Sequence, residues 1–402
     1  MTRGTTSLWR TRRFRLLWSG SAVSVLGLEV ADIGYPLAIL ALTGSPAQAG
    51  LFGAVQAVAT LLAGLPAGAV LDRGDRRRVL LVTEGTRAVV TTGVAVALTT
   101  GHLPLGGLFL VAVVLGAMQP FGGAARMLLI RVVVPPDQLT DALTQDEVRS
   151  GSTQLVGPPL GGFLHGLGHA LPFVFTALSF VLSWLCALVL RVPEVEPEAR
   201  APRRDARFLA GVKGIWHVPT LRAATLLVVA VNTTGAPIAL IAVVVLREQA
   251  VAAWAIGLVM SGMAAGVLAG AALVGPLHRR FQPGALLLGV ALAEVPLFAG
   301  LALPLGPWWV AAILFCATLC APTLRVLVDV LIFRQVPDER RGRTIAAVMT
   351  LFGAGVPAGM AAGGLLLQHF GTATAVLVPA VALAAPAVHA LCRPEIRRAR
   401  WP

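Results

Sequence analysis

Long runs of apolar residues make up most of the chain, and short polar segments separate them. A helix of about 20 apolar residues crosses the hydrocarbon core of a bilayer, and twelve segments of this chain reach that length. We expect them at residues 14–42, 47–71, 79–100, 104–130, 139–167, 171–191, 221–246, 252–277, 284–304, 307–333, 343–369 and 371–392. The pattern therefore predicts an all-α membrane protein with twelve transmembrane helices.

The longest polar stretch divides the expected helices into two sets of six. It covers residues 192–220 and is rich in proline and arginine, and its end at 208–216 has the pattern of a short amphipathic helix on the membrane surface. The sequence therefore predicts an N-terminal six-helix bundle at 1–191, a cytoplasmic linker at 192–220 and a C-terminal six-helix bundle at 221–402.

The two halves repeat a pattern of prolines, glycines and one arginine at a separation of about 200 residues. The first copy runs through Pro120, Arg126, Val134–Pro136 and Gly157–Gly162, and the second through Pro322, Arg325, Val336–Pro337 and Gly355–Gly359. Parallel repeats of this kind occur in secondary transporters, in which the substrate binds between the repeats near the midplane. The repeat therefore favours two pseudo-symmetric bundles.

Composition and charge support a membrane location. The mean hydropathy is +0.81, and only 13% of residues are charged, against about 25% in soluble domains.

The net charge is +13, but the basic residues are spread over loops rather than gathered in one patch, which argues against nucleic-acid binding. They occupy Arg3–Arg15, Arg73–Arg78, Arg191–Arg222, Arg279–Arg280, Arg334–Arg343 and Arg393–Arg400, all on one predicted side, whereas the other side holds Arg247. Basic loops stay cytoplasmic, so we expect a protein of the cell membrane with both termini in the cytoplasm.

Motifs of soluble enzymes do not occur in the sequence. It contains no G-x-S-x-G elbow, no P-loop and no H-E-x-x-H. The four cysteines, Cys186, Cys316, Cys320 and Cys392, lie in or at the end of apolar segments without histidines or carboxylates that would complete a metal site. We therefore expect no enzymatic activity, no cofactor, no metal and no use of ATP.

Three groups of residues resemble a known superfamily. The pattern Gly68-x-x-x-Asp72-Arg73-x-x-Arg76-Arg77-Arg78 resembles the loop 2–3 signature of the major facilitator superfamily. Gly157-Pro158-x-x-Gly161-Gly162 is similar to the core of the helix 5 signature of its antiporter branches, although Thr153 stands where the longer pattern prefers glycine. Tyr35–Leu37 and Leu42–Pro46 resemble the start of drug, macrolide and siderophore exporters. The resemblance implies the twelve-helix fold of that superfamily and alternating access.

Two carboxyl groups lie near the middle of the first expected helix. Glu29 and Asp32 are three residues apart and so share a helix face. A charge at the bilayer centre is costly, and a carboxyl group there can take up a proton on one side and release it on the other. We predict that at least one of the two couples transport to protons. The alternative is a structural carboxyl group that forms a hydrogen bond with a neighbouring helix.

The resemblance also implies a cytoplasmic gate, in which the acid after helix 2 closes against the start of helix 11. Asp72 and the arginines near Arg343 match those positions. Arg325 and Asp329 are four residues apart, which suggests an inner-gate salt bridge, and Arg126 is the counterpart of Arg325. Glu84 and Arg87 are interpreted as a local pair. The predicted gate comprises Gly68, Asp72, Arg73, Arg76, Arg77, Arg126, Arg325, Asp329, Arg341 and Arg343.

Small residues recur every four positions on the second, fifth, eighth and eleventh expected helices, which allows close helix packing. In the family these helices form the contact between the two halves. The predicted interface residues are Gly157, Pro158, Gly161, Gly162, Gly266, Gly355 and Gly359. Ordinary tight packing is the alternative.

Polar residues at mid-depth are few, which predicts an apolar substrate cavity with sparse hydrogen bonding. The candidate lining residues are Tyr35, Gln56, Gln119, Gln154, Asn232, Met260 and Met263. Glu294 stands alone in the ninth expected helix, where a packing or lipid-boundary role is favoured. Together these features predict a monomeric, proton-coupled exporter of small lipophilic compounds. The alternatives are a proton-coupled uptake carrier and a membrane sensor or scaffold that transports nothing.

Overall fold

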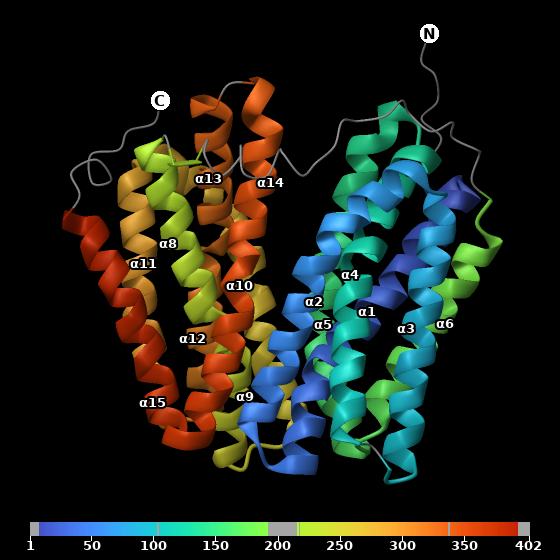
Figure 1. Cartoon of the computed structure of the whole chain (residues 1–402), viewed down its shortest axis with the longest axis horizontal. Coiled ribbons are helices and arrows are strands. Elements are labelled where there is room, and N and C mark those ends of the chain that lie inside the picture. The colour runs from blue at the N-terminus through green and yellow to red at the C-terminus, as the bar shows by residue number, and fades with distance from the viewer. Residues whose placement is uncertain (1–7, 103, 192–214, 217, 337, 393–402) are drawn as a thin grey trace. The chain divides into compact units, whose positions relative to one another are not determined.

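The computed structural model describes residues 8–102, 104–191, 215–216, 218–336 and 338–392, and in these ranges every regular element is a helix (Figure 1). The helices of the first half are η1 Leu8–Arg10, α1 Arg12–Thr43, α2 Pro46–Arg73, α3 Arg76–Thr99, α4 Leu105–Val133, η2 Pro136–Gln138, α5 Leu139–Leu167 and α6 Leu171–Val189. Those of the second half are α8 Pro219–Gly235, α9 Ile238–Glu248, α10 Ala253–Arg280, α11 Pro283–Gly300, α12 Pro307–Leu319, α13 Ala321–Gln335, α14 Asp338–Ala354 and α15 Val356–Cys392.

The expected membrane crossings correspond to these helices. Ten described helical segments are long and apolar enough to cross a membrane. One of them, Thr344–Val388, contains two expected crossings, because the chain turns at Gly371 inside α15 with a φ of 75°. Glycine tolerates this left-handed backbone conformation because it has no Cβ. The all-α membrane fold is therefore confirmed.

The helix α5 differs from the others in its polarity. Its second half is apolar, but its first half carries Asp141, Asp146, Glu147 and Arg149, and it is not among the ten segments. Two of the expected helices are also broken where the sequence contains proline: α8 and α9 meet at Pro237, and α12 and α13 meet just before Pro322. Proline cannot continue the helical hydrogen-bond pattern, so these breaks follow from the sequence.

The chain forms two compact units. Unit 1 contains Met1–Ala38, Val58–Ala199 and Ala253–Leu258, and unit 2 contains Ile39–Ala57, Arg200–Ala252 and Val259–Pro402. The first turns of α2 thus belong to unit 2, and the first turns of α10 belong to unit 1. The predicted linker lies mostly outside the described residues, so the bundle limits at 191 and 221 stay a prediction.

Each unit has an apolar core on one part of its helices. In unit 1, Phe14 of α1 packs with Leu71, Leu80 and Leu129 of α2, α3 and α4. In unit 2, α8, α11, α13 and α14 meet around a second cluster that includes Leu221, Leu287, Leu327 and Val348. Ile215 also lies in that cluster and is fully buried. The amphipathic helix predicted at 208–216 otherwise falls outside the described residues.

Glycines allow helices of the same unit to cross with their backbones in contact. In unit 1, a Cβ on Gly161 of α5 would lie 2.7 Å from the carbonyl oxygen of Val30 in α1, and a Cβ on Gly157 would overlap Glu29. In unit 2, a Cβ on Gly359 of α15 would overlap the carbonyl oxygen of Thr233 in α8. The two halves therefore repeat the same crossing, with a glycine-bearing helix lying on the first helix of its own half.

Other glycines join helices from different halves of the sequence. In unit 2, a Cβ on Gly50 of α2 would lie 2.6 Å from the carbonyl oxygen of Met360 and 2.7 Å from the Cα of Gly364, both in α15. The Ser45 hydroxyl, before α2, donates to the Gln368 amide oxygen at 2.7 Å. These contacts explain why the start of α2 belongs to unit 2.

The predicted interface residues take different partners. Gly157 and Gly161 face α1, Gly266 faces α12, and Gly355 and Gly359 face α8. Gly162 faces the start of α10, where a Cβ would lie 3.1 Å from the Cα of Gly257, and a Cβ on Gly257 would in turn overlap the Pro158 carbonyl oxygen. All these contacts lie inside a unit, so a role for these residues between moving halves stays a prediction.

Candidate functional site

The two predicted proton-coupling carboxyl groups lie on α1 inside unit 1. Asp32 is exposed although Ala31, Ile33 and Tyr35 around it are buried, and Glu29 is half-buried. Intramembrane charges face the bundle interior or a water-filled cavity. Glu29 packs against Gly157 of α5, where a larger residue would push the two helices apart. The protein therefore covers Asp32 less than it covers Glu29.

Tyr35 lies one turn after Asp32 and anchors this part of α1. Its ring packs against Phe173 of α6, with the ring centroids 4.9 Å apart, and its hydroxyl interacts with Thr91 of α3. Tyr35 is only 2% exposed. It therefore packs between helices, and a contribution to the substrate cavity stays a prediction.

A buried group of charged residues joins α3 and α4 in unit 1. Glu84 of α3 accepts a hydrogen bond from Arg126 of α4 at 2.6 Å, and the Arg87 guanidinium lies 3.5 Å from the same carboxylate oxygen. The side chains of Glu84 and Arg87 are 0% and 1% exposed. Arg126 also donates to the Ser24 hydroxyl of α1 at 2.9 Å, and the Arg87 guanidinium lies over the ring of Phe180 in α6. We call Glu84, Arg87 and Arg126 the buried charge group.

The buried charge group joins three helices, which the sequence alone did not predict. Glu84 and Arg87 were interpreted as a local pair, and Arg126 was assigned to the gate. Glu84, Arg87 and Arg126 are charged residues inside apolar runs, and this is the same signal by which Glu29 and Asp32 were identified. The packing of α4 on α3 at Gly122, where a Cβ would lie 3.4 Å from Arg87, brings Arg126 close to Glu84. A gate role for Arg126 stays a prediction.

Electrostatic interactions connect the carboxyl groups of α1 with the buried charge group. Asp32 interacts with Arg87 of α3 and with Glu29 one turn earlier on α1. Three acids and two arginines are thus arranged from α1 across α3 to α4, with Glu84 between the arginines. Such an arrangement can hold a negative charge at Asp32 or release it by protonation.

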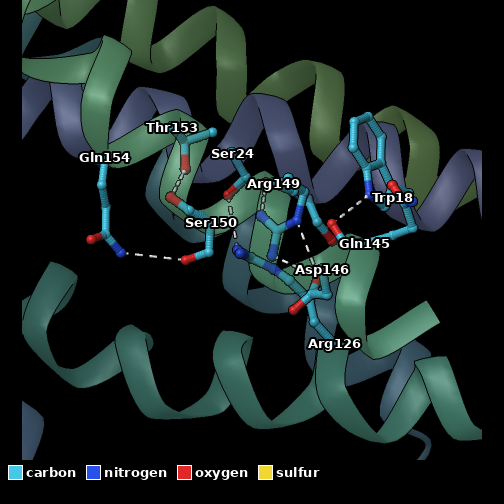
Figure 2. Close-up of polar contacts among 10 residues, drawn as sticks. Trp18, Ser24, Arg126, Gln145, Asp146, Arg149, Ser150, Thr153 and Gln154 are labelled. Atoms are coloured by element: carbon cyan, nitrogen blue, oxygen red, sulfur yellow. Dashed lines mark hydrogen bonds and ion pairs between the residues drawn. The ribbon is translucent and has the colours of Figure 1, made fainter. Parts of the chain in front are cut away.

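A second polar contact holds the first half of α5 on α1 (Figure 2). Arg149 donates to the Asp146 carboxylate at 2.7 Å and to the backbone oxygen of Ser21 at 3.1 Å. The Trp18 indole donates to the backbone oxygen of Gln145 at 3.3 Å. Gln154, a predicted cavity residue, donates to the Ser150 hydroxyl on its own helix. This contact places the polar half of α5 against α1.

The remaining predicted cavity residues are divided between the units. Gln119 of α4 is exposed and lies in unit 1, whereas Gln56, Asn232, Met260 and Met263 lie in unit 2. The Asn232 amide donates to the backbone oxygen of Phe352 at 3.1 Å, which ties α8 to α14. A single cavity lined by all of them stays a prediction.

Two of the predicted gate arginines bind the carboxyl ends of helices. Arg77 donates to the backbone oxygens of Ala187 and Leu188 in α6 at 3.0 and 2.6 Å. Arg341 donates to the backbone oxygen of Phe333 in α13 at 2.8 Å and stacks on its ring. An arginine at the carboxyl end of a helix donates hydrogen bonds to the last backbone carbonyl oxygens, and its positive charge interacts favourably with the helix dipole.

The other predicted gate residues show fewer contacts. Asp72 and Arg325 are exposed, Gly68, Arg76 and Asp329 are half-buried, and the side chains of Arg73 and Arg343 lie outside the described residues. Asp329 interacts electrostatically with Arg325. Asp75, which the sequence analysis did not select, accepts hydrogen bonds from the backbone of Arg77 and Arg78 and caps α3. The gate as a whole stays a prediction.

Replacing Arg77 with alanine is expected to destabilise unit 1. It removes two hydrogen bonds from the end of α6, and a hydrogen bond contributes about 0.5–1.5 kcal/mol to stability. Arg78 is the matched control, because its side chain is 84% exposed and its ion pair with Asp75 is a surface pair. Thermal unfolding of the purified variants in detergent measures the difference. Equal melting temperatures for Arg77→Ala and Arg78→Ala would contradict a structural role for Arg77.

Glu294 of α11 is buried in unit 2, as expected of a packing residue. It is 8% exposed and interacts electrostatically with Cys320 at the junction of α12 and α13. Within the described part of the chain, no group of three or more His, Cys, Asp or Glu side chains is placed to hold a metal ion.

Comparison with protein families identifies one match. The sequence model described as Major Facilitator Superfamily matches residues 17–331 and 255–402, which together cover most of the chain.

Several bacterial transporters are similar to this chain. The enterobactin exporter EntS of Salmonella typhimurium is 26% identical over 339 residues, which is 82% of this chain and 80% of that protein. EntS of Escherichia coli O1:K1 / APEC is 24% identical over 336 residues, with 82% and 79% coverage. The uncharacterised MFS-type transporter YkuC of Bacillus subtilis is 24% identical over 197 residues, so this match spans about half of each chain, 48% and 45%.

Solved structures share the fold. A bacterial homologue of the human lysosomal transporter Spinster, in an inward-facing and occupied conformation, superimposes with a TM-score of 0.77 at 16% identity, covering 99% of both chains. The nucleoside transporter NupG gives a TM-score of 0.74 at 14% identity, covering 94% of this chain and 98% of that one.

Proposed function

The chain belongs to the Major Facilitator Superfamily, and from this membership we propose that it exports small lipophilic compounds in exchange for protons. As a member of that family it is a multi-pass membrane protein and a secondary transporter, not an enzyme. Its substrate, the direction of transport and the coupling ion are the proposed part.

The observation that carries the proposal is the position of Asp32. It is an exposed carboxyl group in the middle of α1, next to a buried arginine and a second carboxyl group. A charged group at this depth is costly and marks a functional site by default. A structural carboxyl group would instead be expected to be buried and saturated with hydrogen bonds.

Two further observations favour export. The similarity to enterobactin exporters extends over 82% of the chain, and the helix 5 pattern Gly157–Gly162 resembles that of antiporters. A lipophilic substrate is favoured by the few polar residues among the candidate cavity residues. By the distribution of arginines, we place the chain in the inner membrane with both termini cytoplasmic. We also expect it to work as a monomer.

Accumulation of fluorescent lipophilic compounds tests this proposal. Cells that contain the protein are expected to accumulate less of at least one compound than cells without it, and a protonophore should remove the difference. Higher accumulation in the presence of the protein would indicate uptake instead. No difference for any compound of a broad panel, siderophores included, would contradict export of this substrate class.

A further inference from the structure

Four arginines lie at the start of α1 without an acid beside them. They are Arg10, Arg12, Arg13 and Arg15, and all four are exposed. The first acid along the sequence is Glu29, and in the described part of the chain no carboxylate forms an ion pair with any of the four arginines. We call these four residues the basic patch.

The start of α3 shows how the protein compensates a similar sequence. Arg76, Arg77 and Arg78 open that helix, and the carboxylate of Asp75 accepts hydrogen bonds from the backbone N–H groups of Arg77 and Arg78. The amino end of a helix carries a partial positive charge, so that anions stabilise it and cations do not. The first turn of α1 also contains arginines but no acid. An anion from outside the chain would therefore stabilise the basic patch.

The length of α1 places the basic patch at the level of the lipid headgroups. The helix has 32 residues, which corresponds to a length of about 48 Å, whereas the hydrocarbon core of a bilayer is about 30 Å thick. Arg12 and Arg15 lie about 20 Å from the middle of the helix, and the hydrocarbon ends about 15 Å from the bilayer centre. The anions that this part of α1 meets are the phosphates of lipids.

Three aromatic rings hold the basic patch on unit 1. The ring of Trp9 packs edge-on against the rings of Phe14 and Trp18, with centroid distances of 5.8 and 5.0 Å. Phe14 lies in the apolar core, and Trp18 donates a hydrogen bond to the backbone oxygen of Gln145 in α5. Trp9 itself is 43% exposed, and tryptophan is enriched at the membrane–water interface. The arginines are thus presented from a fixed part of the fold, next to an exposed interfacial ring.

We propose that the basic patch binds the phosphate group of an anionic phospholipid, and that Arg12 and Arg15 are its main contacts. The two residues are three positions apart and share one face of α1, and guanidinium groups bind phosphate oxygens through paired hydrogen bonds. In the orientation proposed above, this lipid belongs to the cytoplasmic leaflet, whose surface is negative. Lipid binding goes beyond the proposed export and requires no substrate.

Tryptophan quenching tests the proposal with the full-length protein in liposomes. Phosphatidylglycerol and phosphatidylcholine are mixed in varied proportion, and either the first or the second lipid carries brominated chains, which quench a tryptophan in contact with them. The part of the quenching that Trp9→Phe removes reports the lipid next to the basic patch. The binding constant of phosphatidylglycerol relative to phosphatidylcholine is the quantity compared, and the wild-type protein is expected to prefer phosphatidylglycerol.

Two pairs of substitutions remove the same charge at different places. Arg12→Gln with Arg15→Gln should lower the preference for phosphatidylglycerol, by up to about fivefold for each arginine. Arg279→Gln with Arg280→Gln is the matched control, because these two arginines are also exposed and lie at the carboxyl end of α10, where the helix dipole favours a positive charge. The control pair should keep the preference at Trp9.

The outcomes separate a lipid site from a general effect of charge. Equal quenching of Trp9 by the two lipids in the wild-type protein, or an equal loss of preference in both pairs of variants, would overturn the proposal. Loss of the preference on addition of soluble glycerol phosphate would show a site for free anions and would overturn the assignment to a lipid. The measurement involves no transport, so a lipid preference in a protein that exports none of the compounds would support this proposal and reject the proposed function.

Discussion

Asp32→Asn is expected to abolish proton-driven transport while the protein still inserts in the membrane. Asparagine has the shape of a protonated aspartate but cannot release a proton, so the step that couples transport to the gradient is lost. Exchange of substrate for substrate across the membrane needs no net proton movement and should continue. Transport by proteoliposomes, with and without an imposed pH gradient, measures both activities for the same preparation.

Two other acids serve as comparisons for Asp32→Asn. Glu29→Gln tests the half-buried carboxyl group on the α5 crossing, and Glu294→Gln tests a buried acid of unit 2. We expect Glu294→Gln to keep gradient-driven transport. If Asp32→Asn, Glu29→Gln and the double variant all transport normally, neither carboxyl group couples transport to protons.

Gly359→Ala is expected to destabilise the protein, whereas Gly64→Ala is expected to leave it as stable or to stabilise it. A Cβ at Gly359 would overlap the backbone of Thr233 in α8, but a Cβ at Gly64 has no atom within 4 Å. Overpacking at a tight contact costs about 1–3 kcal/mol, while alanine in place of an unrestrained helical glycine gains up to about 1 kcal/mol.

Thermal unfolding of the two purified variants in detergent provides the measurement for this pair. Both glycines belong to the small-residue pattern of the sequence and differ only in what faces them. Equal melting temperatures for Gly359→Ala and Gly64→Ala would show that the α8–α15 crossing has room for a methyl group.

The sequence predicted the helices well because their signal is local. Apolar runs long enough for the bilayer define almost every crossing, and prolines account for the breaks between α8 and α9 and between α12 and α13. The polar first half of α5 was counted as part of the fifth expected crossing only because of the length and pattern of the segment. What each helix contacts was less predictable, because small residues indicate close packing without naming the partner. Gly157, for example, was predicted to lie at the contact between the two halves, and in the structure it packs on α1 of its own unit.

The candidate site was predicted in part for the same reason. Glu29 and Asp32 stood out because each is an acid inside an apolar run. Glu84, Arg87 and Arg126 satisfied the same criterion, but their meaning depends on α3 and α4 placing them together, 42 residues apart in sequence for Glu84 and Arg126. Helical spacing relates residues on one helix and carries no information about pairs on two helices.

The polarity of α5 has a consequence for biosynthesis. A charged residue in a helix that the translocon passes into lipid carries a cost that is largest at the helix centre, about 2.5–3.5 kcal/mol, and the first half of α5 contains four charged residues. The hydrogen bonds that Arg149 gives to α1 and that Trp18 of α1 gives to α5 offset part of this cost only when both helices are present. The ribosome delivers α1 first, so we expect α1 to assist the insertion of α5. A chain that lacks α1 should therefore leave α5 outside the bilayer and exposed to membrane-protein quality control.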